Sequence, residues 1–145
     1  MRTKVQLVRK TALLGLIALC TSSIGFAQTA TPATGLGQAW PNAADLSFSP
    51  NWHVYVFKLN GVKYIQVNDL NGTIHAAVGV VSGTTMVLPV GVDSQNVSTV
   101  PTLSASSATQ MIYSDATTTV TATPQSNGTT TFEAVDCPSG CGGNG

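Results

Sequence analysis

The sequence contains little charge. Only 8% of its 145 residues are charged, and the six basic side chains equal the six acidic ones in number. Four of the basic residues lie within the first ten positions, so only Lys58 and Lys63 accompany the six acidic residues after position 27. That part of the chain carries a formal charge of −4. It lacks the basic surface that neutralises phosphates, which excludes nucleic acid as an expected partner.

Long apolar runs are also missing. A membrane-spanning helix needs about 20 predominantly apolar residues, and the apolar stretch at residues 12–19 is soon followed by small polar residues. The basic residues before this stretch and the small residues Gly25 and Ala27 after it are typical of a secretory signal peptide. We therefore predict a signal helix over residues 1–27, cleaved before Gln28, and a periplasmic or secreted protein without a membrane span.

Cysteine is scarce, with three in the chain. Cys20 lies in the predicted signal peptide; an alternative treats it as a lipid-modified first residue, which the bulky Leu19 disfavours. The other two, Cys137 and Cys141, enclose Pro-Ser-Gly in a tail rich in Cys and Gly, residues 137–145. An even pair at this spacing predicts a disulfide in an oxidising compartment.

The cysteine pair has one alternative role, a zinc site. Tetrahedral zinc needs four ligands, and the only further soft donors are His53 and His75. These histidines are expected on strands that are not adjacent to each other. Neither a metal ion nor another cofactor is therefore expected.

The chain is rich in signals for β-hairpins. Asn-Gly pairs at 60–61, 71–72 and 127–128 and Ser-Gly at 82–83 separate runs of β-branched and aromatic residues. Asn and Gly tolerate the positive φ angles of the type I′ turn, whose twist matches that of the flanking strands. The predicted strands span residues 52–59, 62–69, 73–81, 84–88, 110–113, 117–123 and 129–135.

These strands predict an all-β fold, a small antiparallel meander of about seven or eight short strands that closes into a sandwich or an open barrel. A single β domain is expected over residues 51–136, after an extended arm at 28–50 in which Asn42 is able to cap one helical turn ending near residue 46. Residues 92–109 are expected to form a loop or an edge segment. In the strand at 117–123 threonine alternates with apolar residues, which predicts a hydroxyl-rich exposed face at a sheet edge.

The first four strands are not expected to fold alone. Their apolar side chains, even if fully buried, do not offset the conformational entropy lost when residues 52–90 become ordered. They need a cover, either the threonine-rich hairpins of the same chain or a second subunit.

The polar residues favour a protein that is not an enzyme. The sequence has no Gly-X-Ser-X-Gly motif for an activated serine. Asp69, Asp93 and Asp115 fall at predicted turns or strand ends, where Asp is favoured for its turn hydrogen bonds. His53 and His75 are the candidates for a general base, and a partly exposed structural role is the expectation for both.

Aromatic residues are few, 6% of the chain, and four of them are candidates for a binding surface. Trp40, Trp52, Tyr55 and Tyr64 are able to form a platform for a sugar or a partner protein. The alternative, which we favour, is that Trp52 and the tyrosines pack the sheet and that Trp40 holds the arm against it.

Together these patterns predict a small exported bacterial β-protein with a non-catalytic binding or structural role. An arm that pairs with the exposed sheet edge of another copy, as in donor-strand complexes, predicts self-assembly into homo-oligomers. The alternative function is a periplasmic inhibitor or a carbohydrate-binding module that uses exposed aromatics. No motif identifies the partner, a protein or a glycan.

Overall fold

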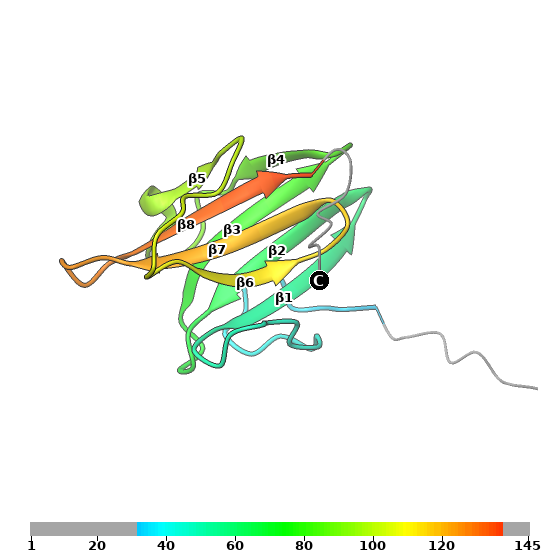
Figure 1. The fold of residues 1–145 in the computed structure, drawn as a ribbon. Coiled ribbons are helices and arrows are strands. Elements are labelled where there is room, and N and C mark those ends of the chain that lie inside the picture. Colours follow the sequence, from blue (N-terminus) through cyan, green and yellow to red (C-terminus); the bar gives the residue numbers. More distant parts are fainter. Residues whose placement is uncertain (1–31, 138–145) are drawn as a thin grey trace, which may run out of the picture. The chain divides into compact units, whose positions relative to one another are not determined.

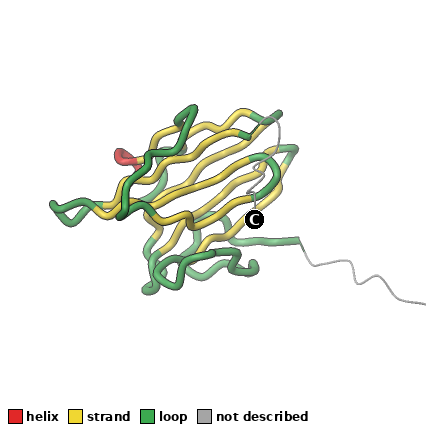
Figure 2. Tube along the Cα trace, viewed as in Figure 1, coloured by secondary structure: helices red, strands yellow, loops and turns green. Residues whose placement is uncertain are grey.

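A computed structural model describes residues 32–137 of the chain (Figure 1, Figure 2). The predicted signal peptide, Cys20 and Cys141 lie outside these residues, so cleavage, lipidation and the disulfide stay predictions.

The described residues form eight strands and one short 3-10 helix, which confirms the all-β class. None of their helices is long and apolar enough to span a membrane. The elements are β1 (His53–Leu59), β2 (Val62–Asn68), β3 (Ile74–Val81), β4 (Thr84–Val87), η1 (Ser94–Asn96), β5 (Val97–Thr99), β6 (Gln110–Ser114), β7 (Thr118–Pro124) and β8 (Thr130–Asp136).

The strands are divided between two four-stranded sheets. The first has the order β1-β2-β3-β4 and is the antiparallel meander that the sequence predicts. The second has the order β5-β8-β7-β6. Each of the seven predicted strands is observed, with ends that differ by at most one residue, because their alternating pattern and turn residues are local features of the sequence.

β5 corrects the prediction of a wholly antiparallel fold. It lies in the segment expected to be a loop or an edge, and it pairs with β8 in parallel, with Val97 opposite Phe132. A parallel pair needs a long connection between its strands. Here the intervening chain passes through β6 and β7 before it returns as β8.

The turns only partly follow the predicted type. A type I′ turn has positive φ at both central residues, and Asn60-Gly61 shows this, with φ angles of 51° and 80°. Ser82-Gly83 has the same geometry, with 51° and 77°. The type I′ prediction is wrong for the other two Asn-Gly pairs, in which Gly72 and Gly128 alone have positive φ. Both form wider turns, in which the glycine N–H donates to the carbonyl three residues earlier.

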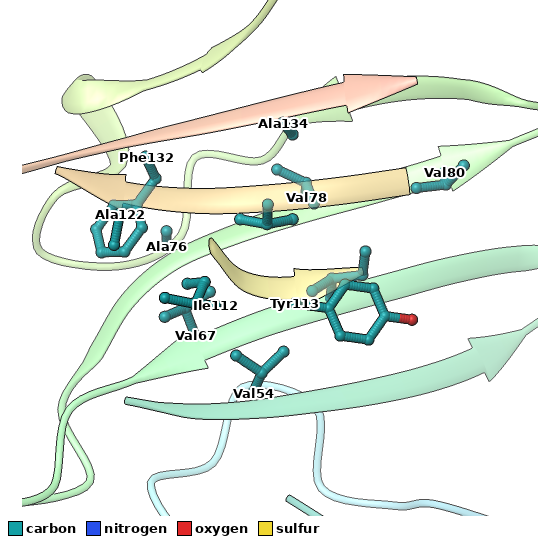
Figure 3. Packing of buried hydrophobic residues seen from close by; sticks show 12 residues of the cluster. Val54, Val67, Ala76, Val78, Val80, Ile112, Tyr113, Ala122, Phe132 and Ala134 are labelled. Atoms are coloured by element: carbon teal, nitrogen blue, oxygen red, sulfur yellow. The ribbon is translucent and has the colours of Figure 1, made fainter. Parts of the chain in front are cut away.

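Side chains of both sheets form one hydrophobic core (Figure 3). The first meander is thus covered by strands of the same chain, one of the two covers that the sequence left open. The threonine-rich hairpin β7–β8 supplies the apolar members of its alternating pattern, among them Val120 and Phe132. The cluster comprises Val54, Ile65, Val67, Ala76, Val78 and Val80 from the first sheet and Ile112, Tyr113, Val120, Ala122, Phe132 and Ala134 from the second.

β7 corrects the prediction of a hydroxyl-rich sheet edge. It lies between β8 and β6, so both of its sides are paired. Thr119 and Thr121, on the face opposite Val120, are buried rather than exposed. The Thr119 hydroxyl lies 2.8 Å from that of Ser114 on β6. The alternating pattern identified the apolar face correctly, but the position of the strand within the sheet depends on pairings between distant residues.

The N-terminal arm packs against the sheets. Asn42 caps no helix and instead forms an isolated β-bridge with Thr34, so the expected helical turn is absent. Farther along, the Leu46 N–H donates to the carbonyl of Val54 on β1 at 2.8 Å, and the Phe48 N–H donates to that of Ile112 on β6 at 2.9 Å. The arm therefore connects β1 and β6, which are edge strands of the first and the second sheet.

Candidate functional site

Trp40, at the end of the arm segment that crosses the first sheet, is the most exposed of the predicted aromatic residues, with 60% of its surface accessible. Its indole lies directly on Gly72, where an added Cβ would come within 2.8 Å of the ring atom Cε2. It also meets the His53 ring edge-on, with centroids 5.8 Å apart. One side of the indole is therefore supported by the protein while much of the ring remains open to solvent.

A histidine and a carboxylate adjoin the indole. His53 Nδ1 lies 2.7 Å from Asp45 Oδ2, and the other Asp45 oxygen accepts the N–H groups of Val54 and Ser47. Partial burial opposes ionisation of Asp45, but these hydrogen bonds and the nearby His53 outweigh it, so the pKa of Asp45 lies below its usual value. We call Trp40, His53 and Asp45 the indole surface.

Two buried amides hold the arm in place beneath Trp40. Gln66 and Asn68 are fully buried on β2, on the face of the sheet opposite the core. Gln66 accepts the Gly37 N–H at 2.7 Å and donates to the Gln38 carbonyl at 2.9 Å, while Asn68 donates to the Ala39 carbonyl at 2.8 Å. Buried amides that are fully hydrogen-bonded orient a segment strongly. Sequence reasoning missed them, because polar residues that alternate with Ile65 and Val67 look like an ordinary solvent-facing side of a strand.

The other three predicted aromatics do not join Trp40 in one platform. Tyr55 is buried behind His53, with ring centroids 6.1 Å apart, and burial raises its pKa, helped by the negative charge of Asp45. Trp52 packs against the core, where its ring meets His75 at 5.0 Å and Phe132 at 5.2 Å. Tyr64 is half-buried and pairs in register with Phe57, farther along the sheet.

His75 lies between two carboxylates. Its Nδ1 is 2.7 Å from Asp93 Oδ2 and its Nε2 is 3.4 Å from Asp69 Oδ2. Desolvation raises the pKa of Asp69, but the backbone N–H groups of Thr73 and Asn71 lower it further, so the net pKa is below normal. Within residues 32–137, no group of three or more His, Cys, Asp and Glu is arranged to hold a metal ion.

Comparisons with known proteins add no assignment, since no family model, no curated protein and no solved structure matches the chain. The function is therefore inferred from the residues themselves.

Proposed function

We propose that this protein is a non-catalytic binding module, exported by a bacterium to the periplasm or the cell exterior, in which the two sheets form a sandwich and the indole surface captures a glycan. The observation that carries the proposal is the exposed indole of Trp40, supported from behind by Gly72 and His53. What distinguishes Trp40 from the other exposed apolar side chains is that its ring is supported on one side and open to solvent on the other, which suits stacking against a flat ligand.

The neighbours of the indole favour a sugar. A flat aromatic face suits the apolar face of a pyranose ring, and polar groups at its margin fix the orientation of the bound ligand. The Asp45 side chain is 41% exposed and ionised at neutral pH, so it is able to accept hydrogen bonds from sugar hydroxyls. Its bonds to His53, Val54 and Ser47 hold it in place for this purpose.

The surroundings of the histidines support a role without catalysis. A nucleophilic mechanism needs a hydroxyl or thiol hydrogen-bonded to the base. Among the described residues, the hydrogen-bond partners of His53 and His75 are carboxylates. His75 also contacts Trp52 and Phe132 of the core, as expected for a structural residue.

Self-assembly through sheet edges is the second candidate. Leu46 and Phe48 already bond to β1 and β6 of their own chain, so assembly would require two copies to exchange these segments, as in domain swapping. A single monomeric species in size-exclusion chromatography with light scattering at high protein concentration would remove this candidate.

The glycan proposal is tested with the mature protein and a panel of bacterial polysaccharide fragments in isothermal titration calorimetry. We expect Trp40→Ala to abolish binding with an unchanged circular dichroism spectrum. Phe48→Ala is the matched control, because Phe48 is also 60% exposed but lies at the arm–β6 contact. Glycan binding that survives Trp40→Ala contradicts the proposal. If a pull-down with the wild type captures a protein and the Trp40→Ala variant does not, the ligand of the indole surface is a protein and the glycan proposal is wrong.

A further inference from the structure

A hollow of about 530 Å³ opens between the two sheets. It lies where the turns that follow β3 and β6 come together, at Ser82-Gly83 and at residues 115–117. Its apolar lining includes Val56 and Val80 from the first sheet and Leu46 from the arm. The volume falls within the range of about 300–1,000 Å³ that is typical of small-molecule sites.

Both cationic side chains of residues 32–137, Lys58 and Lys63, line this hollow. They are directly opposite each other in the register of β1 and β2. Like charges at such positions repel each other and weaken a sheet. The hollow is therefore the place where the positive charges of the described residues are concentrated.

The two lysines differ in their partners. Lys63 Nζ lies 2.6 Å from Asp115 Oδ2 and also donates to the hydroxyls of Thr117 and Thr118, which occupies all three of its donors. Lys58 is exposed and forms no ion pair with any residue that the structure describes.

The hollow retains one positive charge. Burial opposes ionisation of Asp115, but its bonds to Lys63 and Tyr113 hold its pKa well below the usual value, so it is ionised. Burial, together with the hydrogen bond from its hydroxyl to Asp115, raises the pKa of Tyr113, so that residue stays neutral. Two lysines and one carboxylate leave a net charge of +1, carried by Lys58.

We propose that the hollow binds a small carboxylic acid with an apolar body, such as a medium-chain fatty acid, with the carboxylate on Lys58 and the hydrocarbon against Val56, Val80 and Leu46. A bound carboxylate would pair with Lys58, the lysine of the hollow that has no carboxylate partner among the described residues. The hydrocarbon would fill an apolar space that opens to solvent. The lining of the hollow shares no residue with the indole surface.

The test titrates the purified protein with octanoate, 1-octanol and octylammonium, which share a chain length and differ in charge, and follows backbone amide NMR shifts. We expect octanoate to bind most tightly, octylammonium least, and the shifts to gather around Lys58, Tyr113 and residues 115–117. Lys58→Gln should lower the affinity for octanoate by about tenfold and leave the affinity for 1-octanol unchanged. Lys58→Arg, which keeps the charge, should retain most of the octanoate affinity.

Equal affinity for octanoate and octylammonium, no octanoate binding at millimolar concentration, or an octanoate affinity unchanged by Lys58→Gln would each overturn the proposal. Lys58 is exposed, so these variants are expected to fold normally. Trp40→Ala should not change octanoate binding. Failure of the glycan proposal and failure of the fatty-acid proposal are therefore distinguishable.

Discussion

Gly91 shows how one residue brings two distant segments together. Its φ is +107°, and an added Cβ would lie 2.2 Å from the carbonyl oxygen of His75. This close approach lets the following residues, Val92 and Asp93, donate their N–H groups to Ile74 and His75. The Asp93 carboxylate then reaches His75 Nδ1. The contact between His75 and Asp93 thus depends on a position without a side chain.

We expect Gly91→Ala to lower the free energy of unfolding by more than the about 1–2 kcal/mol that left-handed backbone strain alone costs, because the methyl group also collides with the His75 carbonyl. Urea unfolding followed by circular dichroism measures the loss. Gly128→Ala is the control: its φ is +87° and an added Cβ meets nothing within 4 Å. Equal losses in the two variants would show that the close approach has no energetic role.

The arm is held on the first sheet by side-chain hydrogen bonds from β2. Asn68→Ala removes the amide that donates to Ala39 and leaves that carbonyl and Gln66 without one of their partners. We expect a loss of about 1–3 kcal/mol, together with faster proteolysis at residues 32–41. Mass spectrometry of limited digests identifies the cleavage sites.

Gln125→Ala is the control for the arm variant, because Gln125 is an exposed amide that donates to the carbonyl of Thr123. It should change neither stability nor the digestion pattern. An Asn68→Ala protein that is digested at the wild-type rate would mean that the arm is held by its backbone contacts at Leu46 and Phe48 instead.

Over the described residues as a whole, the two sheets are joined by polar contacts as well as by the core. Lys63 of β2 meets Asp115 beyond β6, and Thr85 of β4 donates to Asp136 of β8. The pKa of Asp115 is lower in the folded protein than the about 3.9 of an unfolded aspartate. The stabilisation that ionised Asp115 contributes is therefore complete above the unfolded pKa of about 3.9 and is lost as the pH falls below that pKa.

We expect the free energy of unfolding to fall as the pH is lowered below about 4, in part because Asp115 becomes protonated in the unfolded chain while it stays ionised in the folded protein. Asp115→Asn should be less stable than the wild type by about 1 kcal/mol at pH 7, and the difference should shrink at pH 3. Urea unfolding of both proteins between pH 3 and pH 7 measures this difference in the free energy of unfolding. A difference of the same size at both pH values would exclude the ionised Asp115 as its source.

Several features of the fold were predictable because they depend on neighbouring residues. The Asn-Gly and Ser-Gly pairs and the alternating runs between them located seven strands and the apolar face of β7–β8. By contrast, the indole surface was predicted only through Trp40. His53 and Asp45 are eight residues apart and meet because the arm folds back onto β1. The burial of Gln66 and Asn68 has the same origin.

The sequence by itself determined that this chain forms hairpins and which side of each strand is apolar, because turn geometry and side-chain alternation are properties of adjacent residues. Only the tertiary structure decided that β5 lies parallel to β8, that β7 is an inner strand, and that Lys58 and Lys63 line one hollow between the sheets. Those outcomes depend on which strands pair and which faces meet, and the free energy that selects them comes from burial and hydrogen bonds between residues far apart in the chain.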